Sequence, residues 1–403
     1  MRYEIQLPDN KSIKIRRMVI AYVRGVEIPP VMDADGSDVR IVWRALHTMA
    51  DAKRVGADAV TTIDVVDCGA AYRFLMPLLA ATSGTWLLTG TTRLLHRPIL
   101  PLVEVLRGIG AEIEREGDGW LIKGKTFRSV ETLHAASLQR GKTDTDTASD
   151  TGLSLTLDAS QSSQLASALV LAAPLLGLKT LHLTTTDIPS LSYLRMTLAL
   201  TRDWPVEIPG VDVPDNPVGA PGDWSAALFW FAHARLHPEN EYVLSPLTLE
   251  SIQGDSVICQ WFKKLNLSIS IKGSNVFLKT LPLEKMSQLV LDVCDNLDTV
   301  PVMAALAALL PADITFQNVR NLKYKESDRL HALVTQLQPY AQITHSENEL
   351  RMVGNGRSLV AGAGLDTCHD HRLAMAFLLF GPNAELNDVE CLRKSYPGLL
   401  EQM

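Results

Sequence analysis

Apolar residues recur along much of the chain at the three- and four-residue spacing that predicts amphipathic helices. The pattern is clear at residues 330–337 and 373–379, and each of these stretches follows a short charged run. A longer apolar run at 165–178 contains Ser167 and Pro174, and it predicts a buried helix shorter than a membrane span. At the N-terminus, Tyr3-Glu4-Ile5-Gln6-Leu7 alternates between apolar and polar residues and predicts a strand.

One larger pattern occurs three times: a helical stretch, a break, and two short strand-like segments around a polar turn. The three turns are Gly117-Asp118-Gly119, Gly273-Ser274-Asn275 and Ser346-Glu347-Asn348. Weaker copies, in which a helix gives way to strand-like alternation, occur near 39–65 and 191–208. Repetition of this kind predicts an α/β fold in which repeats fill the whole chain.

Length and composition predict two domains and indicate where the boundary between them lies. A chain of 403 residues with 46% hydrophobic content is too long for one ordinary core, so two domains are expected. The stretch 205–223 carries five prolines and is the best linker candidate. The polar segment 134–150 predicts a solvated loop, and its Gly141-Lys142-Thr143 lacks the earlier glycine of a phosphate-binding loop.

Charge and cysteine content narrow the classes of partner. There are 38 basic and 45 acidic residues, and the net charge of -7 argues against nucleic acid or an anionic membrane as the main partner. The five cysteines are scattered without a C-x-x-C pair, so a disulfide framework is not expected. With no secretion-like segment at the N-terminus, a reducing cytoplasm fits best.

The two charged runs are Lys325-Glu326-Ser327-Asp328-Arg329 and Asp370-His371-Arg372. A helix N-terminus has unpaired backbone N–H groups and the positive end of the helix dipole, so we interpret both runs as anion-binding helix starts. Other polar groups occupy the same place relative to a following apolar helix. They are Lys11, Ser12 and Arg16; Asp67, Gly69 and Arg73; Arg93 and Arg97; Ser162, Ser163 and Gln164; Ser190 and Tyr193; and Asp298.

Each of these groups taken singly also has a simpler interpretation. The serines and aspartates are typical helix N-caps, and each Arg or Lys is typical of a solvated surface. Cys368, His369 and His371 are too close in sequence to converge readily on one zinc ion, so no metal is predicted. Cys68 has no histidine placed beside it as a base and is interpreted as a small apolar residue.

In combination, these residues resemble the EPSP synthases of the enolpyruvyl transferase family over nearly the entire chain. The motifs that carry the resemblance are Leu7-Pro8-x-x-Lys11-Ser12-x-x-x-Arg16, Gly69-x-x-x-Arg73, Arg97-Pro98-Ile99, Ser162-Ser163-Gln164, Ser190-x-x-Tyr193, Lys325-Glu326-Ser327-Asp328-Arg329, Asp370-His371-Arg372 and Lys394-Ser395-Tyr396-Pro397. The last three are specific in combination.

The resemblance implies a two-domain inside-out α/β barrel, each domain built from three βαβαββ repeats, with the active site in the interdomain cleft. Residues 11–222 would form the lower lobe and mainly bind shikimate 3-phosphate. Residues 1–10 and 223–403 would form the upper lobe, which is catalytic and binds phosphoenolpyruvate.

The reaction implied is transfer of the enolpyruvyl group of phosphoenolpyruvate to the 5-hydroxyl of shikimate 3-phosphate, with loss of phosphate. By the same resemblance, the phosphoenolpyruvate-binding residues are Lys11, Asp67, Gly69, Arg97, Arg329, Arg372 and Lys394. The shikimate 3-phosphate-binding residues are Ser12, Arg16, Ser162, Ser163, Gln164, Ser190, Tyr193, Asp298, Asn321 and Lys325. No cofactor is expected.

Addition to the enol needs a base for the hydroxyl and an acid for the methylene carbon. The resemblance assigns the base to Asp298 and the proton donor to Glu326, with Lys11 assisting. We expect Glu326→Gln to retain substrate binding and to lose most turnover.

The chain departs from the family pattern at a few positions. Asp67 stands where the family usually has Asn, and Ala70 stands where it usually has Thr. A carboxylate beside an anion should weaken phosphoenolpyruvate binding unless it turns away, is protonated or pairs with a cation. Trp224 replaces a small residue at the expected second crossing between domains, where it would affect closure.

Two alternatives stay open at this point. One is the sister transferase that acts on a UDP-sugar, although no cysteine lies near residues 93–97, where that enzyme usually carries one. The other is a paralogue that binds phosphorylated metabolites without turnover. The chain itself is expected to be a cytoplasmic monomer without nucleic-acid or membrane partners.

Overall fold

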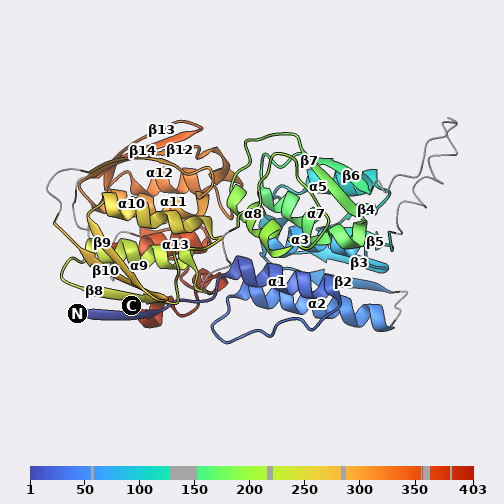
Figure 1. The fold of residues 1–403 in the computed structure, drawn as a ribbon. Helices are drawn as coiled ribbons and strands as arrows, with labels where there is room; N and C mark the ends of the chain where they lie inside the picture. The colour runs from blue at the N-terminus through green and yellow to red at the C-terminus, as the bar shows by residue number, and fades with distance from the viewer. Residues whose placement is uncertain are drawn as a thin grey trace. The chain divides into compact units, whose positions relative to one another are not determined.

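The computed structural model describes most of the chain, and Figure 1 labels its helices and strands. The described residues are 1–55, 59–127, 152–215, 221–282, 287–354, 356, 364–381 and 384–403. The predicted loop at 134–150 and the middle of the predicted linker at 205–223 lie outside them. Among the described helices, none combines the length and the apolar character that crossing a bilayer requires.

The chain divides into two compact units. The first unit contains Met1–Ser12, Met32–Ser37 and Asn216–Met403, and the second contains Ile13–Val31 and Asp38–Asp215. The assignment of one substrate to each predicted lobe stays a prediction.

Among the described residues, these units differ from the predicted lobes at 11–12, 32–37 and 221–222, all of which lie with the first unit. Gly36 gives the physical reason for the middle segment. A Cβ atom at Gly36 would lie 2.3 Å from the carbonyl oxygen of Lys394, so only glycine permits this close approach of two backbones. The contact holds the segment against the first unit.

Three four-stranded sheets share one arrangement. In each, the first two strands in sequence pair in parallel, and the last two form a hairpin whose final strand pairs antiparallel with the second. The first unit holds β1 (Arg2–Gln6), β8 (Glu241–Ser245), β9 (Leu267–Lys272) and β10 (Asn275–Thr280), and also β11 (Ser287–Asp292), β12 (Ala312–Gln317), β13 (Ala341–His345) and β14 (Glu349–Gly354). The second unit holds β2 (Val60–Asp64), β3 (Gly84–Thr89), β4 (Glu112–Glu116) and β5 (Gly119–Gly124).

The three hairpins predicted from the repeated turns are confirmed as β4–β5, β9–β10 and β13–β14. Apolar residues face one another across each hairpin, as in the pairs Ile113–Ile122, Ile271–Val276 and Ile343–Met352. Gly117 and Gly273 supply the positive φ that two of the turns require. Shorter parallel pairs are formed by β6 (Leu153–Leu157) with β7 (Leu178–Leu183) and by β15 (Gly364–Leu365) with β16 (Glu385–Leu386).

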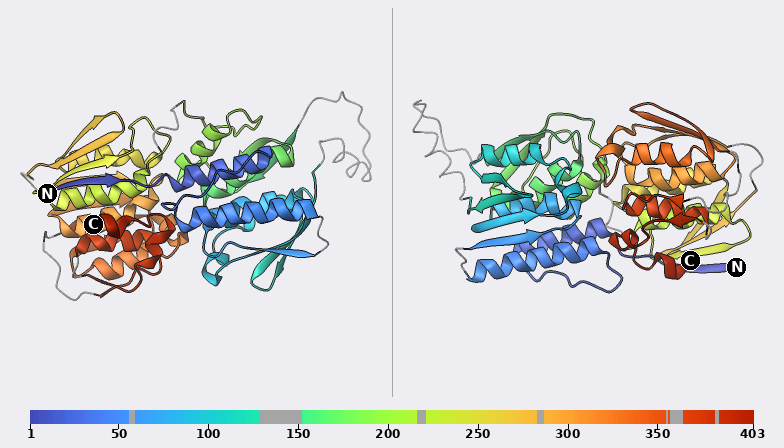
Figure 2. Two further views of the ribbon diagram at one scale, coloured as in Figure 1. Left: turned by 90° about the horizontal axis from the view of Figure 1, so that it is seen from below. Right: turned by 180° about the vertical axis from the view of Figure 1, so that it is seen from behind.

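The first unit gathers its helices around α11. They are α9 (Trp224–Leu236), η1 (Gly254–Val257), α10 (Ile258–Lys264), η2 (Leu297–Thr299), α11 (Val300–Leu309), η3 (Arg320–Tyr324), α12 (Arg329–Leu337), α13 (His371–Phe377), η4 (Leu378–Phe380), η5 (Glu390–Lys394) and α14 (Leu399–Gln402). Residues 300–308 of α11 are all buried, because this helix is apolar on every side and packs against α9, α12 and α13 (Figure 1). Both chain ends belong to this unit (Figure 2), and the Gln6 N–H donates to Gln402 Oε1 at 3.1 Å.

The second unit has α3 and α7 at its centre. Its helices are α1 (Lys11–Arg24), α2 (Ser37–Val55), α3 (Gly69–Ala80), α4 (Thr92–Leu95), α5 (Leu100–Gly108), α7 (Ser163–Leu176) and α8 (Leu191–Leu200). Helix α7 packs against α3 and α8, and it confirms the buried helix predicted from the apolar run at 165–178.

The predicted helix starts at the two charged runs are confirmed. Asp328 caps α12 and Asp370 caps α13, each accepting a hydrogen bond from a backbone N–H. Arg16 and Arg73, in contrast, do not precede helices but lie within α1 and α3. Helix α3 begins earlier than the apolar pattern indicated because the Cys68 sulfur caps it, accepting from the Ala71 N–H.

Trp224 is accounted for by packing within the first unit. It opens α9, is only 1% exposed, and donates its indole N–H to the Thr248 carbonyl at 3.2 Å. Its backbone N–H donates to Gln253 Oε1 at 3.0 Å. The large side chain therefore fills the core of this unit.

Candidate active site

The first unit brings together a set of charged side chains that we call the ion-pair cluster. Its members are Asp298, Lys325, Glu326, Arg329, Asp370, His371 and Lys394. They come from η2, from the chain leading into α12, from the start of α13 and from the end of η5. All except Asp370 and His371 were among the predicted site residues.

Arg329 and Asp370 form the centre of the cluster. Arg329 Nε donates to Asp370 Oδ2 at 2.8 Å and its Nη2 donates to Oδ1 at 3.1 Å, in a two-bond geometry that fixes both groups. Their side chains are 2% and 0% exposed. Although burial works to raise the pKa of Asp370, Arg329 holds it below its ordinary value.

Asp298 is held by two cations. Arg329 Nη1 lies 2.8 Å from Asp298 Oδ1, and Lys325 Nζ lies 3.2 Å from the same oxygen. Burial works to raise the pKa of Asp298, but Lys325 and Arg329 together hold it well below its ordinary value. Asp298 is therefore ionised at neutral pH.

Glu326 stands between His371 and Lys394. Its Oε2 lies 2.7 Å from His371 Nδ1, and its Oε1 lies 3.1 Å from Lys394 Nζ. Burial works to raise the pKa of Glu326, but His371 and Lys394 hold it well below its ordinary value. Glu326 is thus ionised, so it must gain a proton before it can donate one.

His371 interacts electrostatically with Lys11 as well as with Glu326. Burial is the main cause that lowers the pKa of His371, and the positive charge of Lys11 lowers it further, while Glu326 opposes both. Its Nε2 atom is buried and has no hydrogen-bond partner among the described residues. The ring therefore has one nitrogen directed at Glu326 and one available to a further group.

Arg372 lies near a further buried carboxylate, that of Asp255. Its Nη1 donates to the Ser225 carbonyl at 3.4 Å, and the Ser225 hydroxyl donates to Asp255. Asn296 Nδ2 also donates to Asp255, at 3.1 Å. Burial raises the pKa of Asp255, and the charge of Arg372 opposes this rise.

The remaining predicted residues of the first unit lie at element starts. Lys11 and Ser12 open α1, and Asn321 is buried in η3, three residues before the end of that element.

The ion-pair cluster also has the donor types of a metal site. One ligand atom each from Glu326, Asp370 and His371 lies within 4.8 Å of the others. However, Arg329 and Lys394 already neutralise these carboxylates. A divalent cation would have to displace them, so we interpret the group as ion pairs.

The second unit contributes a different group, which we call the arginine cluster: Asp67, Gly69, Arg73, Arg93 and Arg97. Arg93 Nη2 lies 2.6 Å from Asp67 Oδ2. Arg97 lies directly over Gly69, where a Cβ atom would be 2.3 Å from its Nη1. Any larger residue at position 69 would push this guanidinium away.

Arg73 connects the arginine cluster to the serine motif. Its Nε donates to the Pro98 carbonyl at 3.0 Å, and its Nη1 donates to Gln164 Oε1 at 2.7 Å. Burial lowers the pKa of Arg73, and the neighbouring Arg97 lowers it further. Two like charges this close favour an anion between or beside them, and Arg97 Nε is buried without a hydrogen-bond partner among the described residues.

Arg16 is buried on α1 beside α8. Its Nε donates to Thr197 Oγ1 at 2.7 Å and its Nη2 donates to the Tyr193 carbonyl at 3.1 Å. The guanidinium also lies 5.1 Å from the centre of the Phe74 ring. Burial lowers its pKa to about 10, so it stays charged at neutral pH.

The predicted serines divide between capping and other roles. Ser162 caps α7 by accepting from the Gln164 N–H at 3.3 Å, which is the simpler interpretation. Ser163 is buried in the first turn of the same helix. Ser190 makes no side-chain cap on α8 and has a positive φ of 56°, which is unusual for a residue other than glycine.

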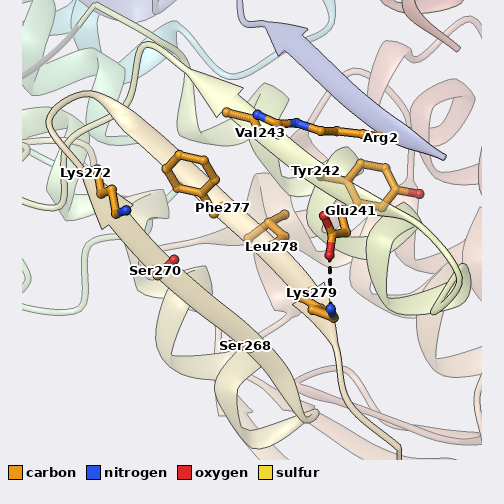
Figure 3. A pocket seen from close by; sticks show the side chains of 10 residues that line it. All are labelled: Arg2, Glu241, Tyr242, Val243, Ser268, Ser270, Lys272, Phe277, Leu278 and Lys279. Carbon is orange, nitrogen blue, oxygen red and sulfur yellow. Dashed lines mark hydrogen bonds and ion pairs between the residues drawn. The ribbon is translucent and has the colours of Figure 1, made fainter.

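A hollow of about 310 Å³ lies elsewhere, on one face of the β1–β8–β10–β9 sheet (Figure 3). Its lining is Arg2, Glu241, Tyr242, Val243, Ser268, Ser270, Lys272, Phe277, Leu278 and Lys279. Lys279 pairs with Glu241 at 3.0 Å, and none of the predicted site residues lines the hollow.

Sequence reasoning missed Asp255 and gave His371 and Asp370 no role of their own. Asp370 and His371 stand inside a motif that was recognised, so their signal was present in the sequence. Asp255 had none, because its contacts with Ser225 and Asn296 join residues 30 and 41 positions apart.

Comparisons with known proteins agree on one family. A sequence model of EPSP synthase (3-phosphoshikimate 1-carboxyvinyltransferase) matches residues 44–403. A 3-phosphoshikimate 1-carboxyvinyltransferase of Bacteroides fragilis is 30% identical over 419 residues, covering 99% of this chain and 94% of the relative. One of Nostoc punctiforme is 28% identical over 347 residues, covering 82% of this chain and 75% of the relative.

Solved structures show the fold. An EPSP synthase of Acinetobacter baumannii matches with a TM-score of 0.67 and 18% identity, covering 100% of this chain and 94% of that one. The enolpyruvyl transferase NikO of Streptomyces tendae matches with a TM-score of 0.64 and 13% identity, covering 99% and 93%. The predicted fold class, the two-domain inside-out α/β fold, is confirmed.

Proposed function

This chain belongs to the EPSP synthase (3-phosphoshikimate 1-carboxyvinyltransferase) family, and we propose from that membership how its residues divide the work of the reaction. The chain is an enzyme of the shikimate pathway. It transfers the enolpyruvyl group of phosphoenolpyruvate to the 5-hydroxyl of shikimate 3-phosphate, and phosphate leaves. Both substrates are polyanions, so cations must hold them.

For phosphoenolpyruvate, the proposed residues are Lys11, Asp67, Gly69, Arg97, Arg329, Arg372 and Lys394. Asp67 and Gly69 act through their backbone. Each charge-assisted hydrogen bond contributes about 1.5–3 kcal/mol, so a few of them bind a small phosphate tightly. The unpartnered buried Nε of Arg97 supports its place in this set.

For shikimate 3-phosphate, the proposed residues are Ser12, Arg16, Ser162, Ser163, Gln164, Ser190, Tyr193, Asp298, Asn321 and Lys325. Arg16 and Tyr193 are joined by a hydrogen bond, and Gln164 is oriented by Arg73. These contacts support a pre-formed group that needs little reorganisation when the ligand arrives.

Asp298 is proposed as the base that takes the proton of the 5-hydroxyl. Lys325 and Arg329 keep it ionised and fix its position. When a substrate phosphate draws one of these cations away, the pKa of Asp298 rises and the carboxylate becomes a stronger base.

Glu326 is proposed as the donor of a proton to the methylene carbon, with Lys11 assisting. The group is ionised before substrate binds, because His371 and Lys394 hold its pKa down. The anionic substrates raise that pKa, and a protonated neighbour, the Lys394 ammonium or His371 in its imidazolium form, can supply the proton that Glu326 then passes on. His371 is the nearer of the two, at 2.7 Å.

The observation that carries the proposal is that Asp298 and Glu326 are each held by two cationic or titratable groups within one buried cluster. The test is phosphate release from phosphoenolpyruvate, measured with and without shikimate 3-phosphate. We expect release only when both substrates are present. No release with both would reject the reaction for this chain.

Glu326→Gln is the variant that tests the mechanism. It should keep the affinity for both substrates, measured by calorimetry, and lose turnover by about 10²–10⁴-fold. Glu347→Gln, which removes an exposed carboxylate paired with Lys323, is the matched control and should keep full turnover. Unchanged turnover in Glu326→Gln would remove this residue from the mechanism.

The two alternative functions are not favoured by the family match. The same assay with a UDP-sugar in place of shikimate 3-phosphate should give no phosphate. We also propose a monomer in the cytoplasm, without nucleic-acid or membrane partners. The net charge of -7 disfavours polyanionic partners, and none of the five cysteines forms a disulfide, which fits a reducing compartment.

A further inference from the structure

Asp67 forms an ion pair with Arg93, which offsets the negative charge that would otherwise disfavour phosphoenolpyruvate binding. A carboxylate at this position would repel an anion bound beside Gly69. Its Oδ2 lies 2.6 Å from Arg93 Nη2, and the side chains of Asp67 and Arg93 are 26% and 35% exposed. Arg93 belongs to α4, four residues before Arg97.

The backbone holds Asp67 in place for this contact. Val66, immediately before it, has a positive φ of 51°, which is a costly conformation for a β-branched residue. Two hydrogen bonds hold it there: the Val66 N–H donates to Asp64 Oδ1 at 2.8 Å, and the Thr91 N–H donates to the Val66 carbonyl at 2.6 Å. The second bond ties the loop to the residue that caps α4, the helix that carries Arg93.

The arginine cluster attracts an anion most strongly when Asp67 is neutralised. The charge of Arg97 lies close enough to Arg73 to lower the pKa of Arg73. An unpaired carboxylate two residues from Gly69 would cancel much of their attraction for phosphoenolpyruvate. Paired with Arg93, it leaves the attraction of Arg73 and Arg97 intact.

We propose that Arg93 is a positioning residue that neutralises Asp67 and thereby sets the affinity of this enzyme for phosphoenolpyruvate. The inference rests on the proposed function, because it assumes that phosphoenolpyruvate binds beside Gly69 and Arg97. Arg93 acts through Asp67 and does not itself need to touch the substrate. Its effect should therefore appear in the KM for phosphoenolpyruvate, with kcat and the KM for shikimate 3-phosphate little changed.

The test is a rescue experiment with three variants. Arg93→Gln should raise the KM for phosphoenolpyruvate about tenfold, because Asp67 is left without this cation. The double variant with Asp67→Asn added should return the KM to within about threefold of the wild-type value. Arg44→Gln, which removes an exposed arginine from α2 in the same unit, is the matched control and should leave every kinetic constant unchanged.

Two results would overturn the inference. One is an unchanged KM for phosphoenolpyruvate in Arg93→Gln. The other is a raised KM that Asp67→Asn does not restore, because Arg93 would then be acting directly. If the wild-type enzyme releases no phosphate, the proposed function fails, and calorimetric titration of phosphoenolpyruvate into the same variants still decides between neutralisation and direct contact.

Discussion

The ion-pair cluster and the arginine cluster differ in their balance of positive and negative side chains and in how deeply their ion pairs are buried. In the first unit, Asp298, Glu326 and Asp370 are each matched by cations, and the central pair of Arg329 and Asp370 is almost completely buried. In the second unit, the arginines outnumber the single carboxylate of Asp67, and that ion pair is partly exposed. Matched buried charges have fixed positions and perturbed pKa values, which suits proton transfer. Excess positive charge suits the binding of anions.

Neutralising Asp298 should give the largest difference between the two clusters. We expect Asp298→Asn to lower kcat by about 10²–10⁴-fold, because the proposed base is lost, with smaller changes in either KM. Asp203→Asn, at an exposed carboxylate paired with Arg24, is the control and should keep wild-type kcat. Steady-state kinetics with both substrates varied measures this. If Asp298→Asn changed only KM, the ion-pair cluster would act in substrate binding, as the arginine cluster is proposed to do, and not in proton transfer.

The second largest difference between the two clusters should be in how much the loss of an ion pair lowers the free energy of unfolding. Asp370→Asn leaves the buried guanidinium of Arg329 without its two-bond partner, so we expect a loss of about 3–5 kcal/mol in the free energy of unfolding. Asp67→Asn breaks a partly exposed pair and should cost less than about 1 kcal/mol. Urea unfolding of both variants tests this, and equal losses would show that burial does not distinguish the pairs.

The smallest expected effect is a loss of folding stability at low pH, and it should arise in the ion-pair cluster. The folded-state pKa of Glu326 lies below its ordinary value of 4.5, so below that pH the unfolded chain takes up the proton first. The stability that the ionised group provides is present above pH 4.5 and is lost as the pH falls. Glu326→Gln should therefore lose less stability than the wild type between about pH 5 and pH 3.

His233 provides an internal reference for this measurement. Burial lowers its pKa from 6.5 to about 4, so the unfolded chain is protonated first below pH 6.5, and stability falls between pH 6.5 and about 4. Both proteins carry His233, so this loss cancels in their difference. Identical urea-unfolding curves for the wild type and Glu326→Gln at every pH would contradict the low pKa assigned to Glu326.

Local pattern in the sequence determined much of the fold. The alternating residues and glycine-containing turns at 117–119 and 273–275 predicted hairpins that the structure confirms. The charged runs before 330–337 and 373–379 predicted helix starts, and Asp328 and Asp370 cap those helices. These features depend on residues a few positions apart, so the sequence displays them directly.

The sequence also identified most residues of both clusters, but it did not show which of them contact one another. It could not tell that Arg329 is held by Asp370 and Asp298, or that Lys394 and His371 share Glu326. It raised the charge of Asp67 as a difficulty without identifying Arg93, 26 residues away, as the partner.

What the tertiary structure alone decided is which charge faces which. Asp255, Ser225 and Asn296 meet although they lie on three separate segments, and no spacing in the sequence announces the contact. The physical reason is that hydrogen-bonded ion pairs act over about 3 Å, whereas the sequence orders residues only along the chain. The residue types thus set what chemistry is available, and the packing of distant segments sets the protonation state in which each group enters the reaction.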